Sequence, residues 1–586
     1  MDLSRLISIA RGDQPADLVL TNARVVDVLS GEIRQSEIAI AGTSVAGIGH
    51  GYRGREVVDI QGRYVCPGFI DAHVHLDSSL VRPQEFARAV IPRGVTTVVM
   101  NPHEIANVLG VEGIRFMLRD AELSPLDVFA SIPSCVPATH LATSGAELKP
   151  SDLEPLFSDP RVIGLGEVMD FLGVVSGDPR LLTQIHASRG RPIDGHCPGL
   201  SGKALNAYAA AGISSDHEST SVDEAKEKLR LGLKVFVREG SVARNLKGLL
   251  PLVTPNNERW LCFCTDDRQP LDLLEEGSID HLVRTAITEG LHPVTAIRMA
   301  TLNPAEHFRL YDRGIIAPGR RADLVIFPHL EAPQPDLVYH GGTLVARGDT
   351  LIAHDRKEAN LSLDLKARNT VHVNWSQVDL RIPAQGNRIR VIGVVPGELL
   401  TECLITEPRI DTGLALADRE RDLLKIAVIE RHHASGRVGL GFVKGIGLNR
   451  GAIASTVAHD HHNLIVIGAD DGSMITAARA VAATGGGQAV AESETVLSLL
   501  PLPIAGLMSD DPIEKVRDQM KALVAAAKGL GSSLHDPFMV MSFLGLEVIP
   551  SIKLTDLGLV DVNAQQVVPL FLSDQGARWT QRDRAS

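Results

Sequence analysis

The sequence predicts an α/β protein: a (β/α)8 barrel, a small β-sandwich domain built from both flanks of the barrel, and a C-terminal α+β domain. Three observations support this prediction. Strand and helix signals alternate eight times between residues 67 and 310, which is typical of a parallel barrel. Runs of short strands lie on both sides of this region, and a further mixed region follows. We expect domain limits of 1–66, 67–312, 313–368 and 369–586.

Length and composition exclude several classes of protein. A chain of 586 residues is too long for one hydrophobic core. The net charge of −13 argues against a general nucleic-acid binder. Because no apolar run reaches membrane-spanning length, we expect no membrane association. The six cysteines are scattered and form no disulfide framework, which favours the reducing cytoplasm.

The two flanks of the barrel carry similar patterns of short apolar runs separated by glycine. On the first side these are Leu18–Leu20, Val25–Val28 and Glu37–Ile40. The pattern returns at 322–327, 337–342 and 344–348. The simplest explanation is one β-domain that is interrupted by the barrel.

Within the insert, eight short apolar runs are spaced as barrel strands, with helical patterns such as Ser221–Leu231 between them. We expect the strands at Phe69–His75, Thr96–Met100, Asp127–Ile132, Val162–Glu167, Pro192–His196, Ile213–His217, Lys234–Arg238 and Trp260–Thr265. In this fold, functional residues lie at the carboxyl ends of the strands.

The first of these strands contains two histidines one residue apart, His73 and His75. Side chains at positions i and i+2 of a strand point to the same face, so both imidazoles can aim at one point. Two neutral imidazoles on a rigid strand suit a divalent transition metal. Asp71 and Asp77 flank the pair at the same spacing.

Histidines and carboxylates also stand at the ends of the other strands. A single strand-end histidine is more often structural than functional, but their repeated occurrence favours a metal-dependent active site. The candidates are Glu104, Glu167, His196, Asp216, His217, Glu218 and Asp266.

Longer motifs resemble a known family. The resemblance is to the amidohydrolase superfamily. It lies at the start of the barrel region, in Pro67–His75, and at its end, in Met299–Ala305 and Gly314–Val325. Within this superfamily, the sequence resembles the bacterial adenine deaminases most specifically. The segments that carry this resemblance are Met100–Gly110, Asp216–Glu218 and Phe263–Arg268 in the barrel region, and Ala458–Asn463 and Pro537–Leu544 in the C-terminal region. The His-x-Glu and Pro-Cys-x-x-Cys signature of the unrelated zinc deaminases is absent from the sequence.

This resemblance implies a hydrolase that releases ammonia from adenine with two divalent metal ions, for which Mn(II) or Fe(II) is favoured and Zn(II) is also possible. Its implied metal ligands are His73, His75, His196, His217 and Asp266. Strand four ends in Glu167 where many relatives carry a bridging lysine. Glu167 is therefore either the bridging ligand or a proton shuttle, and in the second case Glu104 is the spare ligand.

The expected catalytic residues are Asp266, Glu218 and Glu167. Asp266 would take a proton from the attacking water and deliver it to the departing ammonia. Glu218 or Glu167, with a pKa raised by burial, would protonate the ring. Glu218 follows His217 directly, so it reaches the pocket only if the strand has ended there.

The C-terminal region has a histidine cluster of its own, His459, His461 and His462. It is either an extra metal site, part of a lid over the substrate, or a structural feature of a domain joint. Two other functions remain open, namely hydrolysis of a cyclic amide or related heterocycle and a non-catalytic scaffold. We expect a cytoplasmic homo-oligomer, a dimer or larger.

Overall fold

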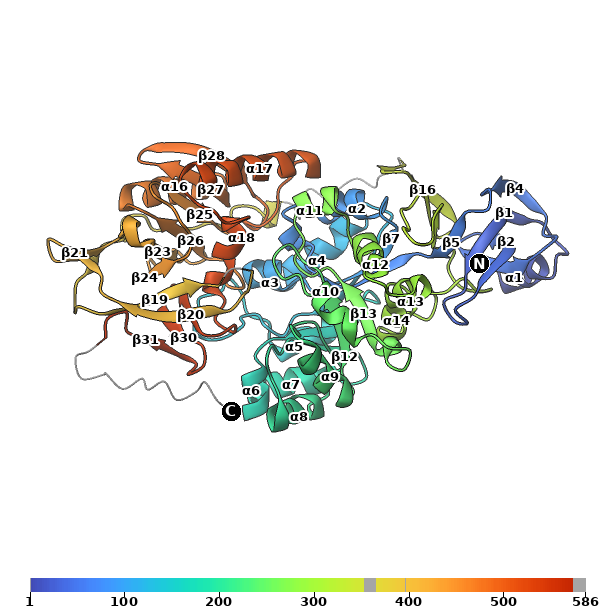
Figure 1. Cartoon of the computed structure of the whole chain (residues 1–586), viewed down its shortest axis with the longest axis horizontal. Coiled ribbons are helices and arrows are strands. Elements are labelled where there is room, and N and C mark those ends of the chain that lie inside the picture. Colours follow the sequence, from blue (N-terminus) through green and yellow to red (C-terminus); the bar gives the residue numbers. More distant parts are fainter. Residues whose placement is uncertain (1, 353–364, 396, 573–586) are drawn as a thin grey trace.

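The computed structural model describes residues 2–352, 365–395 and 397–572. Figure 1 shows three parts side by side: a β-domain containing the N-terminus, a central barrel and a C-terminal domain. Parts of the predicted third and fourth domains (353–364, 396 and 573–586) lie outside the described residues.

The barrel contains all eight predicted strands in one parallel sheet, in the order of the chain. The strands are β6 (Phe69–Val74), β7 (Val95–Met100), β8 (Asp127–Ile132), β9 (Val162–Val168), β10 (Ile193–Gly195), β11 (Ser215–Asp216), β12 (Lys234–Arg238) and β13 (Leu261–Cys264). The barrel closes between its first and last strands through a bridge between Val74 and Asp266.

Helices connect the barrel strands and cover the outside of the barrel (Figure 1). The predicted helix at 221–231 is α9 (Val222–Arg230). Its last turns carry Lys228, which reaches the end of β11. The others are α2 (Pro83–Val90), α3 (His103–Leu109), α4 (Val111–Ala121), α5 (Pro150–Phe157), α6 (Phe171–Ser176), α7 (Pro179–Ala187), α8 (Gly202–Ala210), α10 (Leu246–Leu249), α11 (Pro270–Glu275), α12 (Ile279–Thr288), α13 (Pro293–Met299) and α14 (Leu302–His307).

The flanks of the barrel form a single nine-stranded sheet, packed against α1 (Leu3–Ala10). Strands from the two flanks meet where β5 pairs antiparallel with β14. The first two predicted strands are one long strand, because β1 continues from Ala16 to Val26 across a register shift between Leu20 and Ala23. The strands are β1 (Ala16–Val26), β2 (Ile33–Ala41), β3 (Ser44–Gly49), β4 (Gly54–Asp59), β5 (Tyr64–Pro67), β14 (Leu324–Phe327), β15 (Leu337–His340), β16 (Thr343–Arg347) and β17 (Thr350–Leu351).

The C-terminal domain is built on a mixed eight-stranded sheet covered on both faces. Its strands are β19 (Ile389–Val394), β20 (Thr401–Thr406), β23 (Leu423–Ile429), β24 (Val438–Lys444), β25 (Ala452–Ser455), β26 (Leu464–Gly468), β27 (Gly487–Glu492) and β28 (Thr495–Pro501). Because neighbouring side chains alternate faces, Val466 packs with α16 (Asp471–Ala483) while Ile465 and Ile467 share a core with α17 (Ile513–Gly529).

Two three-stranded sheets and a short helix complete the C-terminal domain. They are β18 (Ile382–Pro383), β21 (Arg409–Asp411) and β22 (Leu414–Leu416), then β29 (Ile552–Thr555), β30 (Gly558–Asp561) and β31 (Gln566–Val568), and α18 (Pro537–Ser542). The apolar alternation at 371–373 predicts a short strand, but this prediction is wrong, because the segment forms no strand.

Polar contacts join the C-terminal domain to the barrel. The backbone N–H and hydroxyl of Thr143 donate to Asp556 at 2.8 and 2.6 Å. Thr139 donates its hydroxyl to Glu547 at 2.9 Å, and the Asn463 amide donates to the Thr143 carbonyl at 2.8 Å. The domain is therefore fixed over the loops at one end of the barrel.

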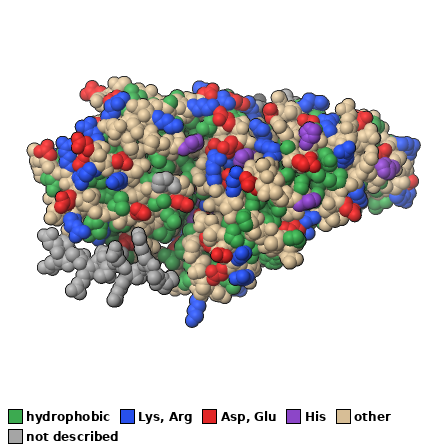
Figure 2. Space-filling view, in the orientation of Figure 1, with side chains coloured by type: hydrophobic (Ala, Val, Ile, Leu, Met, Phe, Trp, Pro, Cys, Tyr) green, Lys and Arg blue, Asp and Glu red, His purple; other side chains and the backbone are tan. Residues whose placement is uncertain are grey.

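Over the described helices, none is both long and apolar enough to cross a membrane. On the face drawn in Figure 2, acidic and basic side chains are interspersed over the surface.

A buried ion pair fixes the end of strand β11. Lys228 Nζ lies 2.7 Å from Asp216 Oδ2, and both side chains are fully buried. Asp216 also accepts from the Cys197 and Glu218 backbone N–H groups, so this carboxylate positions the loops that carry His196 and His217.

Replacing Lys228 with Met is expected to destabilise the protein by about 3–5 kcal/mol, because it leaves Asp216 buried without its counterion. Denaturant unfolding followed by circular dichroism measures this. Lys226→Met is the control on the same helix; Lys226 is half-exposed and 4.0 Å from Asp223, and its loss should cost less than about 1 kcal/mol. Equal losses in the two variants would contradict the role of the pair.

Candidate metal centre and active site

The barrel closure places the two histidines of β6 against the loop after β13. His73 is the second-last residue of β6, and His75 follows the strand directly. Asp266 donates its backbone N–H to the His73 carbonyl at 3.0 Å. The Nε2 atoms of His73 and His75 lie 3.0 Å apart, as the strand periodicity predicted, and His75 Nε2 is 3.5 Å from Asp266 Oδ1.

Glu167, near the end of β9, lies among the four predicted histidines. Its Oε1 is 2.6 Å from His73 Nε2, 2.9 Å from His75 Nε2 and 3.6 Å from His217 Nε2. Its Oε2 is 3.3 Å from His196 Nδ1. One carboxylate thus contacts every predicted histidine ligand, which is the position a bridging ligand requires.

The donor atoms of this cluster fit a metal ion. Among the described residues, Glu167 Oε1 and both ring nitrogens of His196 are buried and make no contact with hydrogen-bond geometry, although Glu167 Oε1 lies close to His73 and His75. Buried polar atoms without such bonds are costly, so their lone pairs need a positively charged partner such as a metal cation. The His75 ring is already oriented by its Nδ1, 2.9 Å from the Asn101 carbonyl.

The charge states favoured for Glu167 and His217 also suit metal ligands. Burial raises the pKa of Glu167, but His217, His73 and His75 lower it by more, so its pKa lies well below the usual range. Burial and the neighbouring His73 hold the pKa of His217 well below its usual value. An ionised carboxylate and a neutral imidazole are the forms that bind metals. The expectation of a raised pKa for Glu167 is therefore wrong, because the histidines outweigh burial.

Glu218 does reach the cluster. Strand β11 ends at Asp216, so the alternation of faces no longer applies to Glu218. Its Oε1 lies 3.5 Å from His196 Nδ1 and 3.6 Å from His217 Nε2. Asp216 points the other way, towards Lys228.

Sequence reasoning missed Arg238, which pairs with both predicted catalytic acids. Its guanidinium contacts Glu218 through both terminal nitrogens and donates from Nη1 to Asp266 Oδ2 at 2.8 Å. Burial raises the pKa of Asp266, but Arg238 and His75 lower it by more, and the carboxylate is ionised. Arg238 is the last residue of β12, so its strand-end position was the available signal.

Asp71 and Asp77, which flank the histidine pair, accept hydrogen bonds that hold neighbouring segments in place. Asp71 accepts from the Thr265 hydroxyl at 2.5 Å and so ties β6 to β13. Burial raises the pKa of Asp71 to about 6. Asp77 accepts the Ile105 backbone N–H at 2.8 Å.

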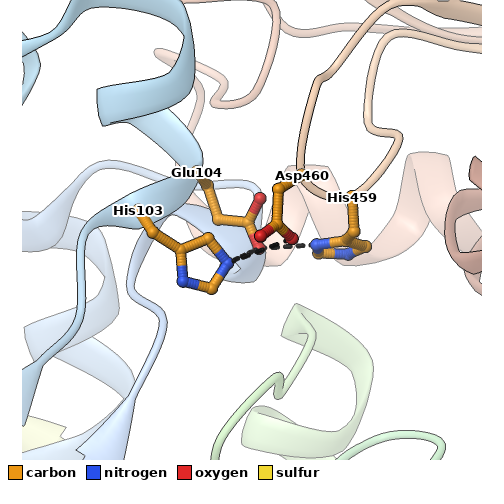
Figure 3. Close-up of side chains that lie close together, drawn as sticks. All are labelled: His103, Glu104, His459 and Asp460. Carbon is orange, nitrogen blue, oxygen red and sulfur yellow. Dashed lines mark hydrogen bonds and ion pairs between the residues drawn. The ribbon is translucent and has the colours of Figure 1, made fainter. Parts of the chain in front are cut away.

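Glu104 lies in a second cluster beside the first. Its Oε1 is 3.0 Å from His103 Nε2 and 2.5 Å from His459 Nδ1 of the C-terminal domain (Figure 3). Its Oε2 contacts His462. His461 points elsewhere, since its Nδ1 accepts the Asn463 backbone N–H. The structure thus separates Glu104 from Glu167, the other candidate for the bridging position.

Both clusters line one cavity, and the C-terminal domain closes it. Its polar lining comes from His75, His103, Glu104, Glu167, His196, His217, Glu218, Arg238, Asp266 and Asp267 of the barrel, with His459 and Asp460. The C-terminal domain also contributes the apolar side chains Leu399, Phe543, Leu546 and Ile549. A ligand in this cavity would therefore meet both polar and apolar groups.

Comparison with known proteins agrees with this geometry. Residues 64–345 match the amidohydrolase family, and residues 398–566 match the adenine deaminase C-terminal domain. An adenine deaminase of Desulfatibacillum aliphaticivorans is 48% identical over 97% of this chain and 99% of its own length.

The chain belongs to the adenine deaminase family.

A second adenine deaminase, from Cereibacter sphaeroides, is also 48% identical over 97% of the chain and 99% of its own length. One solved adenine deaminase structure covers 56% of this chain and 99% of its own at 19% identity and a TM-score of 0.42, a similarity too low to add to the assignment. The amidohydrolase family implies divalent metal binding, which matches the buried histidine and carboxylate groups of this adenine deaminase homologue.

Glu167→Gln is expected to weaken divalent-metal binding about tenfold or more. The amide keeps the size of the side chain but loses the negative charge of the carboxylate that lies among the four histidines. Competition with a chelating dye measures the affinity. Glu154→Gln, an exposed position on α5, is the control and should bind metal as the wild type does. Unchanged affinity in Glu167→Gln would exclude Glu167 as a ligand.

Proposed function

We propose that this protein hydrolyses adenine to hypoxanthine and ammonia. The observation that carries this proposal is the near full-length similarity to adenine deaminases, which includes the C-terminal domain that closes the cavity. The cavity lining supports it, since it combines acids and histidines with apolar side chains.

The proposed metal ligands are His73, His75, Glu167, His196, His217 and Asp266. Glu104, the alternative carboxylate ligand suggested by the sequence, lies in the neighbouring cluster and is not assigned to these metals. Their nitrogen and carboxylate donors suit Mn(II) or Fe(II), and Zn(II) is also compatible. When bound, such ions lower the pKa of a water molecule from about 15.7 towards 7, which supplies a nucleophile at neutral pH.

Two acids would move the two protons of that water. Hydrolysis at C6 needs one proton at the ring nitrogen N1 and one at the departing amine. We assign the first transfer to Glu218 and the second to Asp266, because both carboxylates lie at the cluster and accept hydrogen bonds from Arg238. Glu167, surrounded by histidines, acts as a ligand in this assignment.

Arg238 would keep the two acids in place without reacting. Its planar guanidinium can bond two carboxylates in fixed directions, which a lysine cannot do. The Glu218 and Asp266 carboxylates therefore face the substrate at a set separation, which favours ordered proton transfer.

We further propose that the enzyme is a cytoplasmic homodimer. The free state of all six cysteines supports the reducing location. Light scattering coupled to size-exclusion chromatography measures the subunit number.

Ammonia release from a panel of adenine, adenosine, guanine, cytosine and dihydroorotate tests the substrate. We expect turnover of adenine, its loss on chelation and its recovery with Mn(II), because a metal-activated water is the nucleophile. Turnover of adenosine but not adenine would overturn the free-base assignment. Full activity in verified metal-free protein would overturn the mechanism.

Asp266→Asn is expected to lower kcat for adenine by about 10²–10⁴, because the amide cannot accept a proton from water. Steady-state ammonia release measures this. Glu275→Gln, a half-exposed residue of α11 paired with Lys521, is the matched control and should keep wild-type kcat. Wild-type kcat in Asp266→Asn would remove Asp266 from the proton path.

A further inference from the structure

A second cluster of metal-binding side chains lies between the barrel and the C-terminal domain. His103 and Glu104 begin α3, directly after the second barrel strand, and His459 and Asp460 come from the loop between β25 and β26. Figure 3 shows the two pairs facing one another from opposite sides. We propose that these four residues form a divalent metal site of their own, which neither domain completes alone.

The distances between the donor atoms suit one ion. One donor atom from each residue lies within 4.8 Å of all the others. Donors bound at about 2.0–2.2 Å around a shared ion lie up to about 4.4 Å apart, so small adjustments are sufficient. His103 Nε2 is 3.0 Å from Glu104 Oε1 and 3.4 Å from Asp460 Oδ1.

Burial and charge favour a cation here. The four side chains are between 1% and 3% exposed. In the described part of the chain, the ion pairs of Glu104 and Asp460 are with histidines, and neither pairs with Lys or Arg. Two carboxylates this deeply buried require compensating positive charge.

Unpartnered atoms provide independent support for a ligand. Asp460 Oδ2 and His459 Nε2 are buried and make no hydrogen bond among the described residues. Two imidazoles with two carboxylates are a donor set for Mn(II), Fe(II) or Zn(II). The ring centroids of His75 and His103 are 4.5 Å apart, so the ion would lie beside the proposed catalytic metals.

This site goes beyond the proposed function, because it requires no particular substrate. It gives the C-terminal domain a defined chemical task, which is to supply two ligands to a site at the barrel mouth. The ion would also hold the two domains together at the cavity.

Metal content of the full chain, expressed with Mn(II) and measured by inductively coupled plasma mass spectrometry, tests the proposal. We expect His459→Ala and Asp460→Asn each to bind one ion fewer per chain than the wild type. His433→Ala is the control: His433 lies at the same joint, where its Nε2 is 3.1 Å from the Ser144 carbonyl, and its loss should leave the content unchanged. Asp460→Asn preserves side-chain shape, so it remains informative if His459→Ala does not fold.

Anomalous diffraction from crystals of the Mn(II)-loaded protein gives a second readout. We expect a peak among the four side chains. Wild-type metal content in both variants, or peaks at the His73 and His75 site without one here, would overturn the proposal and leave protonated histidines as the source of charge. Adenine turnover is a separate assay, so failure of the proposed function would not change this metal count.

Discussion

Closure of the barrel between β6 and β13 is the constraint on which the site depends. The bridge between Val74 and Asp266 joins the first and last strands at the level of the histidine pair. Asp71 reinforces the same seam by accepting from the Thr265 hydroxyl. Because these contacts are made by backbone and fully buried groups, the imidazoles and the Asp266 carboxylate are held in place before any ligand binds.

Charge balance determines the roles that the clustered acids can take. Glu167 is surrounded by imidazoles, which favours an ionised ligand. Glu218 and Asp266 share the Arg238 guanidinium, which orients both towards the cavity. Glu104 lies beyond this group and faces the C-terminal domain. Glu167 and Glu104, the two candidates for the bridging ligand, therefore lie in different places. Each carboxylate contacts its own set of histidines.

The sequence predicted the features that depend on local periodicity. The eight barrel strands and the shared face of His73 and His75 follow from alternation and strand-end position, and both are found in the structure. The direction of Glu218 could not be predicted, because it depends on β11 ending after two residues. Arg238 was overlooked because a strand-end arginine resembles an ordinary solvent-facing charge until its two acid partners are known.

The residue contacts between the barrel and the C-terminal domain could not be predicted from local patterns. Glu104 and His459 are separated by 355 residues, and no local pattern links them. Their contact depends on docking of the C-terminal domain, through pairs such as Thr143 with Asp556. Within the C-terminal domain, the Phe543 and His459 rings lie parallel, with centroids 4.4 Å apart. His459 therefore connects the apolar lining of the cavity to the polar cluster. A barrel folded alone would lack both these apolar side chains and half of the second cluster.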